Sequence, residues 1–136
     1  MSESSSNVQT VRRAFERWNA GDHTPPLEDV DPQIEIHSAI ASAFKGEPFR
    51  GYEGIREWLA TLDESFERWD VEIHQIRERG EIVVMLGVLH ARGRGSGLEL
   101  DLPTASVVEF RGGRAIRLRV FQDVDEALAF AGLGRR

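Results

Sequence analysis

No cysteine occurs in the sequence. Disulfide bonds and thiolate metal sites are therefore excluded, and a reducing compartment is expected. The first six residues, MSESSS, lack the basic and apolar regions of a signal peptide. The longest apolar run, residues 82–89, is much too short to cross a bilayer. Together these absences predict a cytoplasmic protein without a membrane partner.

A concentrated basic surface is also missing. The formal net charge is −6, and acidic residues are interleaved with the arginines of the second half of the chain. Because affinity for nucleic acid requires a basic face, no nucleic-acid partner is expected. No two histidines have the spacing of metal ligands, and the glycines of GRGSG (93–97) do not sit between a strand and a helix, as a phosphate loop requires. The sequence therefore predicts neither a metal nor a cofactor.

The 136 residues that are present suit one domain, with a polar tail at 1–6 and a folded part at 7–136. In two segments, apolar residues recur every three or four positions. This spacing predicts amphipathic helices at about 7–21 and 53–66. Residues 39–51 form a long connection of the kind found at pocket mouths.

Alternation of apolar and polar residues predicts strands. It occurs at 33–38, 70–77 and 98–102, whereas 82–89 is apolar throughout. A continuously apolar strand needs cover on both faces, so a central place in the sheet is expected for it. Two long strands joined by a glycine turn occupy 102–123. The order of elements predicts an α+β domain in which helices cover one face of a curved, largely antiparallel sheet and a short helix ends the chain.

The register of the last hairpin can be argued from its side chains. A two-residue turn at Gly112 and Gly113 would pair Val108 with Arg117 and mix charge into both faces. A three-residue loop with a glycine bulge shifts the register by one residue and brings Glu109 near Arg117, so it is preferred. One face then carries Thr104, Ser106, Val108, Phe110, Ile116, Leu118 and Val120.

The opposite face of this hairpin keeps two apolar residues, Val107 and Phe121. With the doubly apolar strand at 82–89, they predict that another copy of the chain covers the outer face of the sheet, forming a homodimer. The alternative is a monomer with two isolated apolar residues on its surface, which is common.

Three segments resemble the SnoaL-like branch of the nuclear transport factor 2-like superfamily. They are VRRAFERWNAGD (11–22), FRGYEGIREWL (49–59) and VVEFRGGRAIRLRVFQDVDEALAFAGL (107–133). The resemblance covers nearly the whole chain. It implies a cone in which about three helices pack over a curved mixed sheet and enclose an apolar cavity. It implies little about activity, because this family contains both enzymes and non-enzymes.

The enzymes of the family allow single positions to be compared. His37 stands where steroid isomerases place a catalytic aspartate, and Ala14 and Ser106 stand where they place the tyrosine and aspartate that stabilise the enolate. Val120 replaces the catalytic aspartate of limonene epoxide hydrolases. Asp123 is the only late-strand candidate for the acid of the polyketide cyclases, but its place before the last helix also fits a capping box.

His37 is the candidate catalytic residue, because an imidazole can transfer a proton near neutral pH. The alternative is a partly exposed residue on the outer side of its strand. Tyr52 is the strongest ligand-contact candidate, since it adds a hydroxyl, and His90 suits either the core or the pocket. The residues expected to contact a ligand are Trp18, Phe44, Tyr52, Trp58, Met85, Ser106, Leu118 and Val120.

The sequence leaves two interpretations open. In the first, the cavity binds a small hydrophobic carbonyl compound, and His37 is the general base in its isomerisation or cyclisation. In the second, the chain is a non-catalytic ligand-binding or dimerisation module, which the missing enolate-stabilising groups favour.

Overall fold

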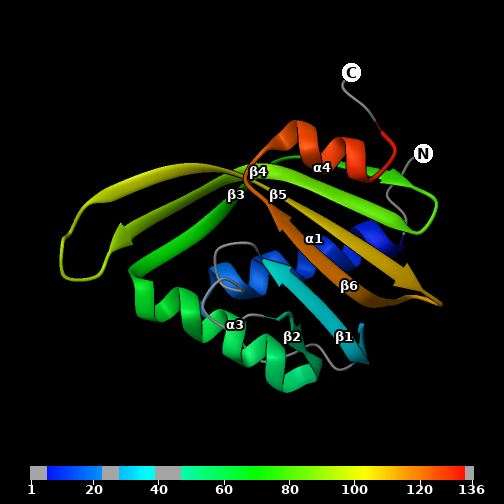
Figure 1. Cartoon of the computed structure of the whole chain (residues 1–136), viewed down its shortest axis with the longest axis horizontal. Coiled ribbons are helices and arrows are strands. Elements are labelled where there is room, and N and C mark those ends of the chain that lie inside the picture. The colour runs from blue at the N-terminus through cyan, green and yellow to red at the C-terminus, as the bar shows by residue number, and fades with distance from the viewer. Residues whose placement is uncertain (1–5, 23–27, 39–46, 134–136) are drawn as a thin grey trace.

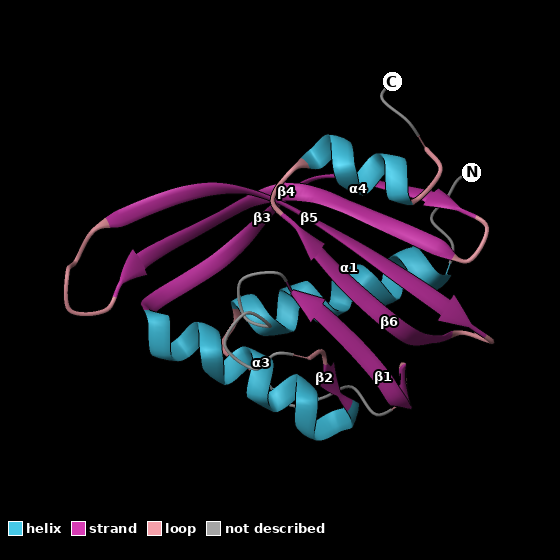
Figure 2. Ribbon diagram, in the orientation of Figure 1, coloured by secondary structure: helices cyan, strands magenta, loops and turns pink. Residues whose placement is uncertain are grey.

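A computed structural model describes residues 6–22, 28–38 and 47–133 of the chain. Within these residues, two long helices lie on one face of a curved sheet and a short C-terminal helix lies on the other (Figures 1 and 2). The predicted α+β class is confirmed. Most of the predicted tail and loop, with Phe44, lies outside the described residues. In chain order the elements are α1 (Ser6–Asn19), β1 (Val30–Ser38), β2 (Phe49–Arg50), α3 (Gly51–Ser65), β3 (Phe66–Arg79), β4 (Ile82–Gly93), β5 (Glu99–Arg111), β6 (Arg114–Phe121) and α4 (Val124–Phe130).

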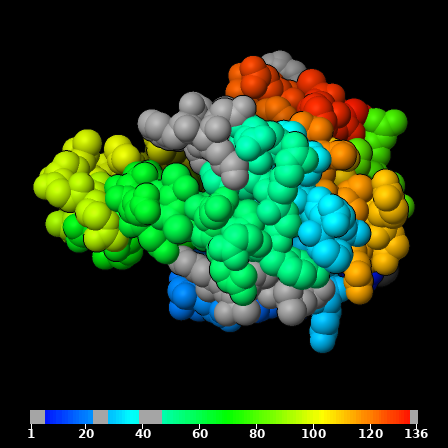
Figure 3. Space-filling model, turned by 60° about the horizontal axis from the view of Figure 1, so that its bottom comes forward, coloured from blue at the N-terminus to red at the C-terminus, as the bar shows by residue number. Residues whose placement is uncertain are grey.

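The described strands form one sheet in the order β2-β1-β6-β5-β4-β3. β1 runs parallel to β6, and the other neighbouring pairs are antiparallel. The apolar strand β4 is next to the edge rather than central, but both its faces are covered as predicted. Val83 and Met85 belong to the core beneath α1 and α3, and Val84 and Leu86 pack on the α4 side. The β4–β5 hairpin projects beyond the helices (Figures 1 and 3).

The register predicted for the β5–β6 hairpin is confirmed, because Glu109 pairs with Arg117. The turn differs from the expectation, however. It consists of Gly112 and Gly113 alone, with φ angles of 61° and 86°. A tight two-residue turn that matches the twist of its strands needs two such left-handed residues, which glycine supplies without strain.

A β-bulge in β6 produces the shift in register. Phe110 pairs with Ala115, whereas the preceding residue of β5 pairs with Arg117. Ile116 is therefore the extra residue of the bulge. Ala115 is buried beside Phe110, and Ile116 is only half-buried. The expectation that Ile116 faces the core is wrong, because the bulge gives that place to Ala115.

The outer face of the sheet is covered by the chain's own C-terminal helix. Ala127 and Leu128 of α4 form one cluster with Val84 and Val107, and Phe121 packs against it. Val107 is fully buried within a single chain. The expectation that Val107 and Phe121 need a second copy to cover them is therefore wrong. The homodimer stays a prediction without that support.

Asp123 caps α4, as its spacing predicts. Its Oδ1 accepts hydrogen bonds from the backbone N–H groups of Asp125 at 2.9 Å and Glu126 at 3.3 Å. Such a cap satisfies donors that the first turn of a helix leaves unpaired. This structural role accounts for the carboxylate of Asp123.

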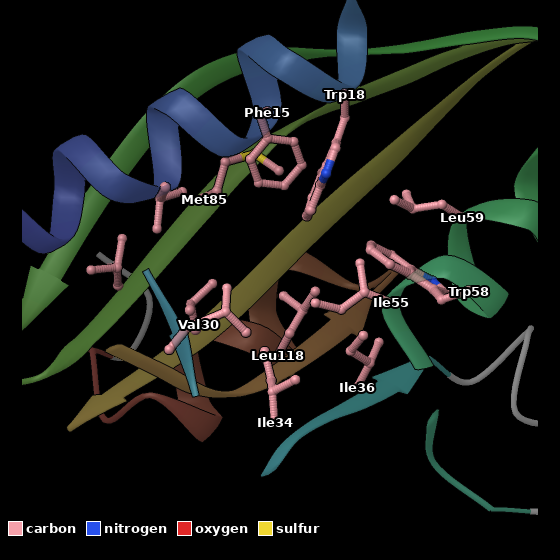
Figure 4. Close-up of a cluster of buried hydrophobic side chains, with 14 of the residues drawn as sticks. Phe15, Trp18, Val30, Ile34, Ile36, Ile55, Trp58, Leu59, Met85 and Leu118 are labelled. Carbon is pink, nitrogen blue, oxygen red and sulfur yellow. The ribbon is translucent and has the colours of Figure 1, made fainter. Parts of the chain in front are cut away.

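The interior lies between the concave face of the sheet and helices α1 and α3. Phe15 and Trp18 of α1 and Trp58 of α3 meet there as a chain of rings (Figure 4). The ring centroids are 5.1 Å apart for Phe15 and Trp18 and 5.5 Å apart for Trp18 and Trp58, both edge-to-face. Each such contact is worth about 0.5–1.5 kcal/mol beyond the area it buries. The Trp18–Trp58 contact joins the two helices above the sheet, and the Phe15–Trp18 contact lies within α1.

Asn19, the last residue of α1, ties this helix to the edge strand β3. Its Nδ2 donates to the carbonyl oxygen of Val71 at 2.9 Å, and its Oδ1 accepts from the N–H of Val71 at 2.8 Å. The amide thus pairs with β3 as a neighbouring strand would, and it fixes the end of α1 that carries Trp18.

Replacing Asn19 with alanine removes both hydrogen bonds. We expect the free energy of unfolding, measured by urea titration, to fall by about 1–3 kcal/mol, because a typical hydrogen bond contributes about 0.5–1.5 kcal/mol. Glu16, which is exposed on the same helix, is the matched control. Glu16→Ala should change the stability by less than about 0.5 kcal/mol. Equal effects of the two substitutions would contradict the role assigned to Asn19.

Candidate functional site

Two cavities lie between the sheet and the helices. The larger measures about 160 Å³ and the smaller about 50 Å³. An apolar cavity of roughly 150 Å³ admits a benzene-sized molecule, so the larger one has room for a single ring. The exposed residues Ser65 and Gln122 are part of its lining and mark its mouth, beside the ends of α3 and β6.

The larger cavity combines an apolar lining with a few hydroxyl and amide groups. Its aromatic residues are Phe15, Trp18, Trp58, Phe66 and Trp69. Its polar residues are Ser38, Thr61, Ser65, Thr104, Ser106 and Gln122. No acidic, basic or imidazole side chain occurs among the described residues that line either cavity. These ionisable side chains are the usual general acids and bases of enzymes.

The strand register places two buried polar residues, Ser38 and Ser106, in one row across the sheet. Ser38, Val120, Ser106 and Met85 stand side by side on β1, β6, β5 and β4, and all four line the larger cavity. Ser106 is only 3% exposed, and it lines the larger cavity. A hydroxyl in a mostly apolar pocket is a group with which a ligand can form a hydrogen bond.

The structure places most of the predicted ligand-contact residues around these cavities. The larger cavity is lined by Trp18, Trp58, Met85, Ser106 and Val120, and the smaller by Trp18, Trp58 and Leu118. Tyr52 lines neither, because its hydroxyl donates to the backbone oxygen of Val30 at 3.2 Å and so fastens α3 to β1. Phe44 lies outside the described residues.

Trp69 is a lining residue that the sequence interpretation did not single out. Strand β3 begins at Phe66 rather than at residue 70, which brings Trp69 into the sheet. Its indole lines the larger cavity, and its Nε1 donates to Oδ1 of Asp63 at 2.9 Å. The sequence did contain a signal for this position: Trp69 continues the alternation of the strand and so shares a face with Val71.

His37 lies on the outer face of the sheet. Its neighbours Ile36 and Ser38 line the cavities, so the alternation of β1 turns His37 outward together with Glu35. Nε2 of His37 is 3.0 Å from Oε1 of Glu35, and 33% of its side chain is exposed. A general base must reach the proton it removes at hydrogen-bond distance. The position of His37 therefore gives no support to a catalytic role in the cavity, and it matches the alternative of a polar residue on the outer side.

Glu35 is the centre of an ion-pair network on this outer face. It accepts a hydrogen bond from Arg50 at 2.9 Å, and Arg117 lies 3.7 Å away. The hydrogen bond with His37, and then the charges of the two arginines, hold the pKa of Glu35 below its ordinary value against the opposing effect of burial. Arg117 also pairs with Glu109 at 2.8 Å, so the network joins β2, β1, β6 and β5.

His90 belongs neither to the core nor to a cavity. It projects from the outer face of β4, where its Nδ1 lies 2.6 Å from Asp101 and its Nε2 lies 2.7 Å from Glu72. The hydrogen bonds with Glu72 and Asp101 raise the pKa of His90 to about 9. No group of three His, Asp or Glu side chains in the described ranges is arranged to hold a metal ion.

Residues 11–118 match the SnoaL-like domain family. The chain belongs to that family. The resemblance that three of its segments show is thereby confirmed, together with the fold it implies. The sequence matches none of the curated proteins at a significant level. None of the helices described for this SnoaL-like domain is long and apolar enough to span a membrane.

Solved structures with the same fold cover nearly all of this SnoaL-like domain. A nuclear transport factor 2-like protein of unknown function from Burkholderia pseudomallei is 21% identical, with a TM-score of 0.79 and coverage of 94% of this chain and 98% of its own. TerC, co-crystallised with polyporic acid, is 21% identical, with a TM-score of 0.77 and coverage of 95% and 98%. A protein proposed to be a SnoaL-like polyketide cyclase, from a Jannaschia species, is 24% identical, with a TM-score of 0.76 and coverage of 100% of both chains. These likenesses show the fold alone.

The His90 ion pairs predict how the stability of this SnoaL-like domain depends on pH. The pKa of His90 rises from an ordinary 6.5 to about 9 in the folded chain. The stabilisation from its charged form is therefore complete below pH 6.5 and is lost as the pH rises through 9. We expect the melting temperature to fall over this interval, and His90→Gln to remove that part of the fall. About 1 M salt should weaken the effect, since the groups are exposed. Identical pH profiles for the two proteins would contradict the assignment.

Proposed function

We propose that the larger cavity binds a small, neutral, largely apolar molecule of about one aromatic ring, without catalysing its conversion. The lining carries the proposal: aromatic and aliphatic side chains with hydroxyl and amide groups, and no ionisable group among the described residues. Pockets of this composition bind through apolar contact and take their orientation from a few polar groups.

The same lining favours an uncharged ligand. An ionised group moved from water into an apolar site without a partner loses several kcal/mol of solvation, whereas a hydroxyl or carbonyl needs one hydrogen bond. The hydroxyl of Ser106 can supply that bond as donor or acceptor. Trp18 and Trp69 offer faces and edges against which a ring can pack.

The alternative is proton transfer on a carbonyl compound with His37 as the base. It requires the imidazole to reach a molecule in the cavity, whereas the sheet separates the two. The likeness to a protein proposed to be a polyketide cyclase supports the fold at 24% identity and does not carry an activity to this chain. The position of His37 therefore favours non-catalytic binding.

Phenol, toluene and benzoate serve as matched probes in a calorimetric titration at pH 7. We expect phenol and toluene to bind and benzoate, which is ionised, to bind at least about tenfold more weakly than phenol. Ser106→Ala should weaken the binding of phenol about threefold to tenfold, because a single hydrogen bond of about 0.5–1.5 kcal/mol is lost. The affinity for toluene, which has no hydroxyl, should stay unchanged.

His37→Ala is the control and should leave the affinities for both neutral probes unchanged. Tight binding of benzoate, or an equal effect of Ser106→Ala on phenol and toluene, would contradict the proposed site. Slower conversion of a bound carbonyl compound by His37→Ala would favour the enzymatic alternative.

A further inference from the structure

The two cavities share three lining residues, Phe15, Trp18 and Trp58. These are the residues of the edge-to-face chain that joins α1 to α3 (Figure 4). Trp18 is the middle member and contacts both of the others. The two cavities therefore adjoin at one aromatic wall, with the indole of Trp18 at its centre; the larger is called the outer chamber and the smaller the inner chamber.

The chemistry of the sheet changes at this wall. In the outer chamber the row across the strands includes the hydroxyls of Ser38 and Ser106. Two residues earlier along β1, the next row contains Ile36, Leu118 and Val108, which line the inner chamber and are all apolar. The inner chamber therefore suits an alkyl group, and the outer chamber suits a ring that carries a polar substituent.

The size of the inner chamber limits what it could hold. Its volume is about 50 Å³. A water-sized group needs about 10–15 Å³ on this measure, so the chamber accommodates on the order of three or four such groups and no ring. A short chain of two to four carbon atoms is the matching occupant.

Trp18 is also held firmly in place. The next residue, Asn19, forms hydrogen bonds with the backbone carbonyl oxygen and N–H of Val71, and Val71 itself lines the outer chamber. The end of α1 is thus fixed to the strand beside the cavity, and Trp18 is only 8% exposed between its two aromatic neighbours. The wall is part of the packed core, so we expect it to stay closed when a ligand enters the outer chamber.

We propose that Trp18 determines which ligands the cavity accepts by limiting their length. The inference rests on ligand binding in the outer chamber as the function. In the unchanged protein a ligand ends at the indole, and the inner chamber stays unused. A smaller side chain at this position joins the chambers and extends the site by a short alkyl chain. Trp18 touches the ligand at its apolar end and decides specificity there.

The test measures the affinity of a series of 4-alkylphenols, from 4-methylphenol to 4-pentylphenol, by calorimetry. The unchanged protein should lose affinity once the alkyl group exceeds the outer chamber. Trp18→Leu should move the best chain length upward by two or three carbon atoms. Each methylene newly buried should improve the affinity about threefold to fourfold, so two should give about tenfold. Trp18→Phe keeps an aromatic contact with Trp58 and should give a smaller shift, which preserves the test if the leucine variant does not fold.

Two further variants separate this role from general packing. Trp69 lines the outer chamber alone, so Trp69→Phe should change all affinities by a similar factor and leave the best chain length unchanged. Ala14 lines only the inner chamber, so the larger side chain of Ala14→Leu should fill that chamber. By itself this substitution should leave the best alkyl chain length as it is in the unchanged protein. Combined with Trp18→Leu, it should cancel the increase in the best chain length. If Trp18 had only a structural role, its replacement would not change which alkyl chain length binds most tightly.

The outcomes distinguish this inference from the proposed function. Binding of the series with a best chain length that neither Trp18 variant shifts would overturn the role of Trp18 alone. A preference of the unchanged protein for the longest alkylphenols would also overturn it, since the wall would then be open. Failure of the unchanged protein to bind any phenol would overturn the proposed function and, with it, this inference.

Discussion

The packing of Trp18 against Trp58 is the contact on which the shape of the interior depends. It joins α1 to α3 across the concave side of the sheet, with ring centroids 5.5 Å apart. Two large rigid rings that meet edge to face cannot also fill the curve of the sheet behind and beside them. Space therefore remains on both sides of the contact. Asn19 keeps this arrangement in place by fixing the end of α1 to β3.

The two faces of the sheet differ in chemistry for a reason of solvation. On the outer face, Glu35, His37 and His90 keep contact with water while they form hydrogen bonds and ion pairs. A group of this kind beneath α1 and α3 would lose its hydration without gaining a comparable partner. The described lining of the cavities is accordingly neutral, and its polar character comes from hydroxyl and amide groups such as Ser106. The histidine that first suggests catalysis, His37, thus lies on the outer face of the sheet.

Several features could be predicted because they depend on neighbours in the chain or on one pair of strands. Apolar spacing located α1 and α3, and the separation of charged from apolar residues selected the register that pairs Glu109 with Arg117. The cap formed by Asp123 follows from local backbone geometry. The direction in which His37 points was harder to predict. Successive residues of a strand point to opposite faces, so a shift of one position places Ser38 rather than His37 toward the cavity.

By itself, the sequence determined the α+β class, the main helices and strands, the hairpin register and membership of the SnoaL-like family, because these are encoded in local periodicity and in recognisable segments. Only the tertiary structure decided which face each side chain occupies and which residues meet. It placed α4 over Val107, turned Tyr52 toward Val30, brought Trp69 to the cavity and put Trp18 between two chambers. These outcomes depend on how curved layers pack in three dimensions, since a cavity is the space that side chains from distant segments leave unfilled.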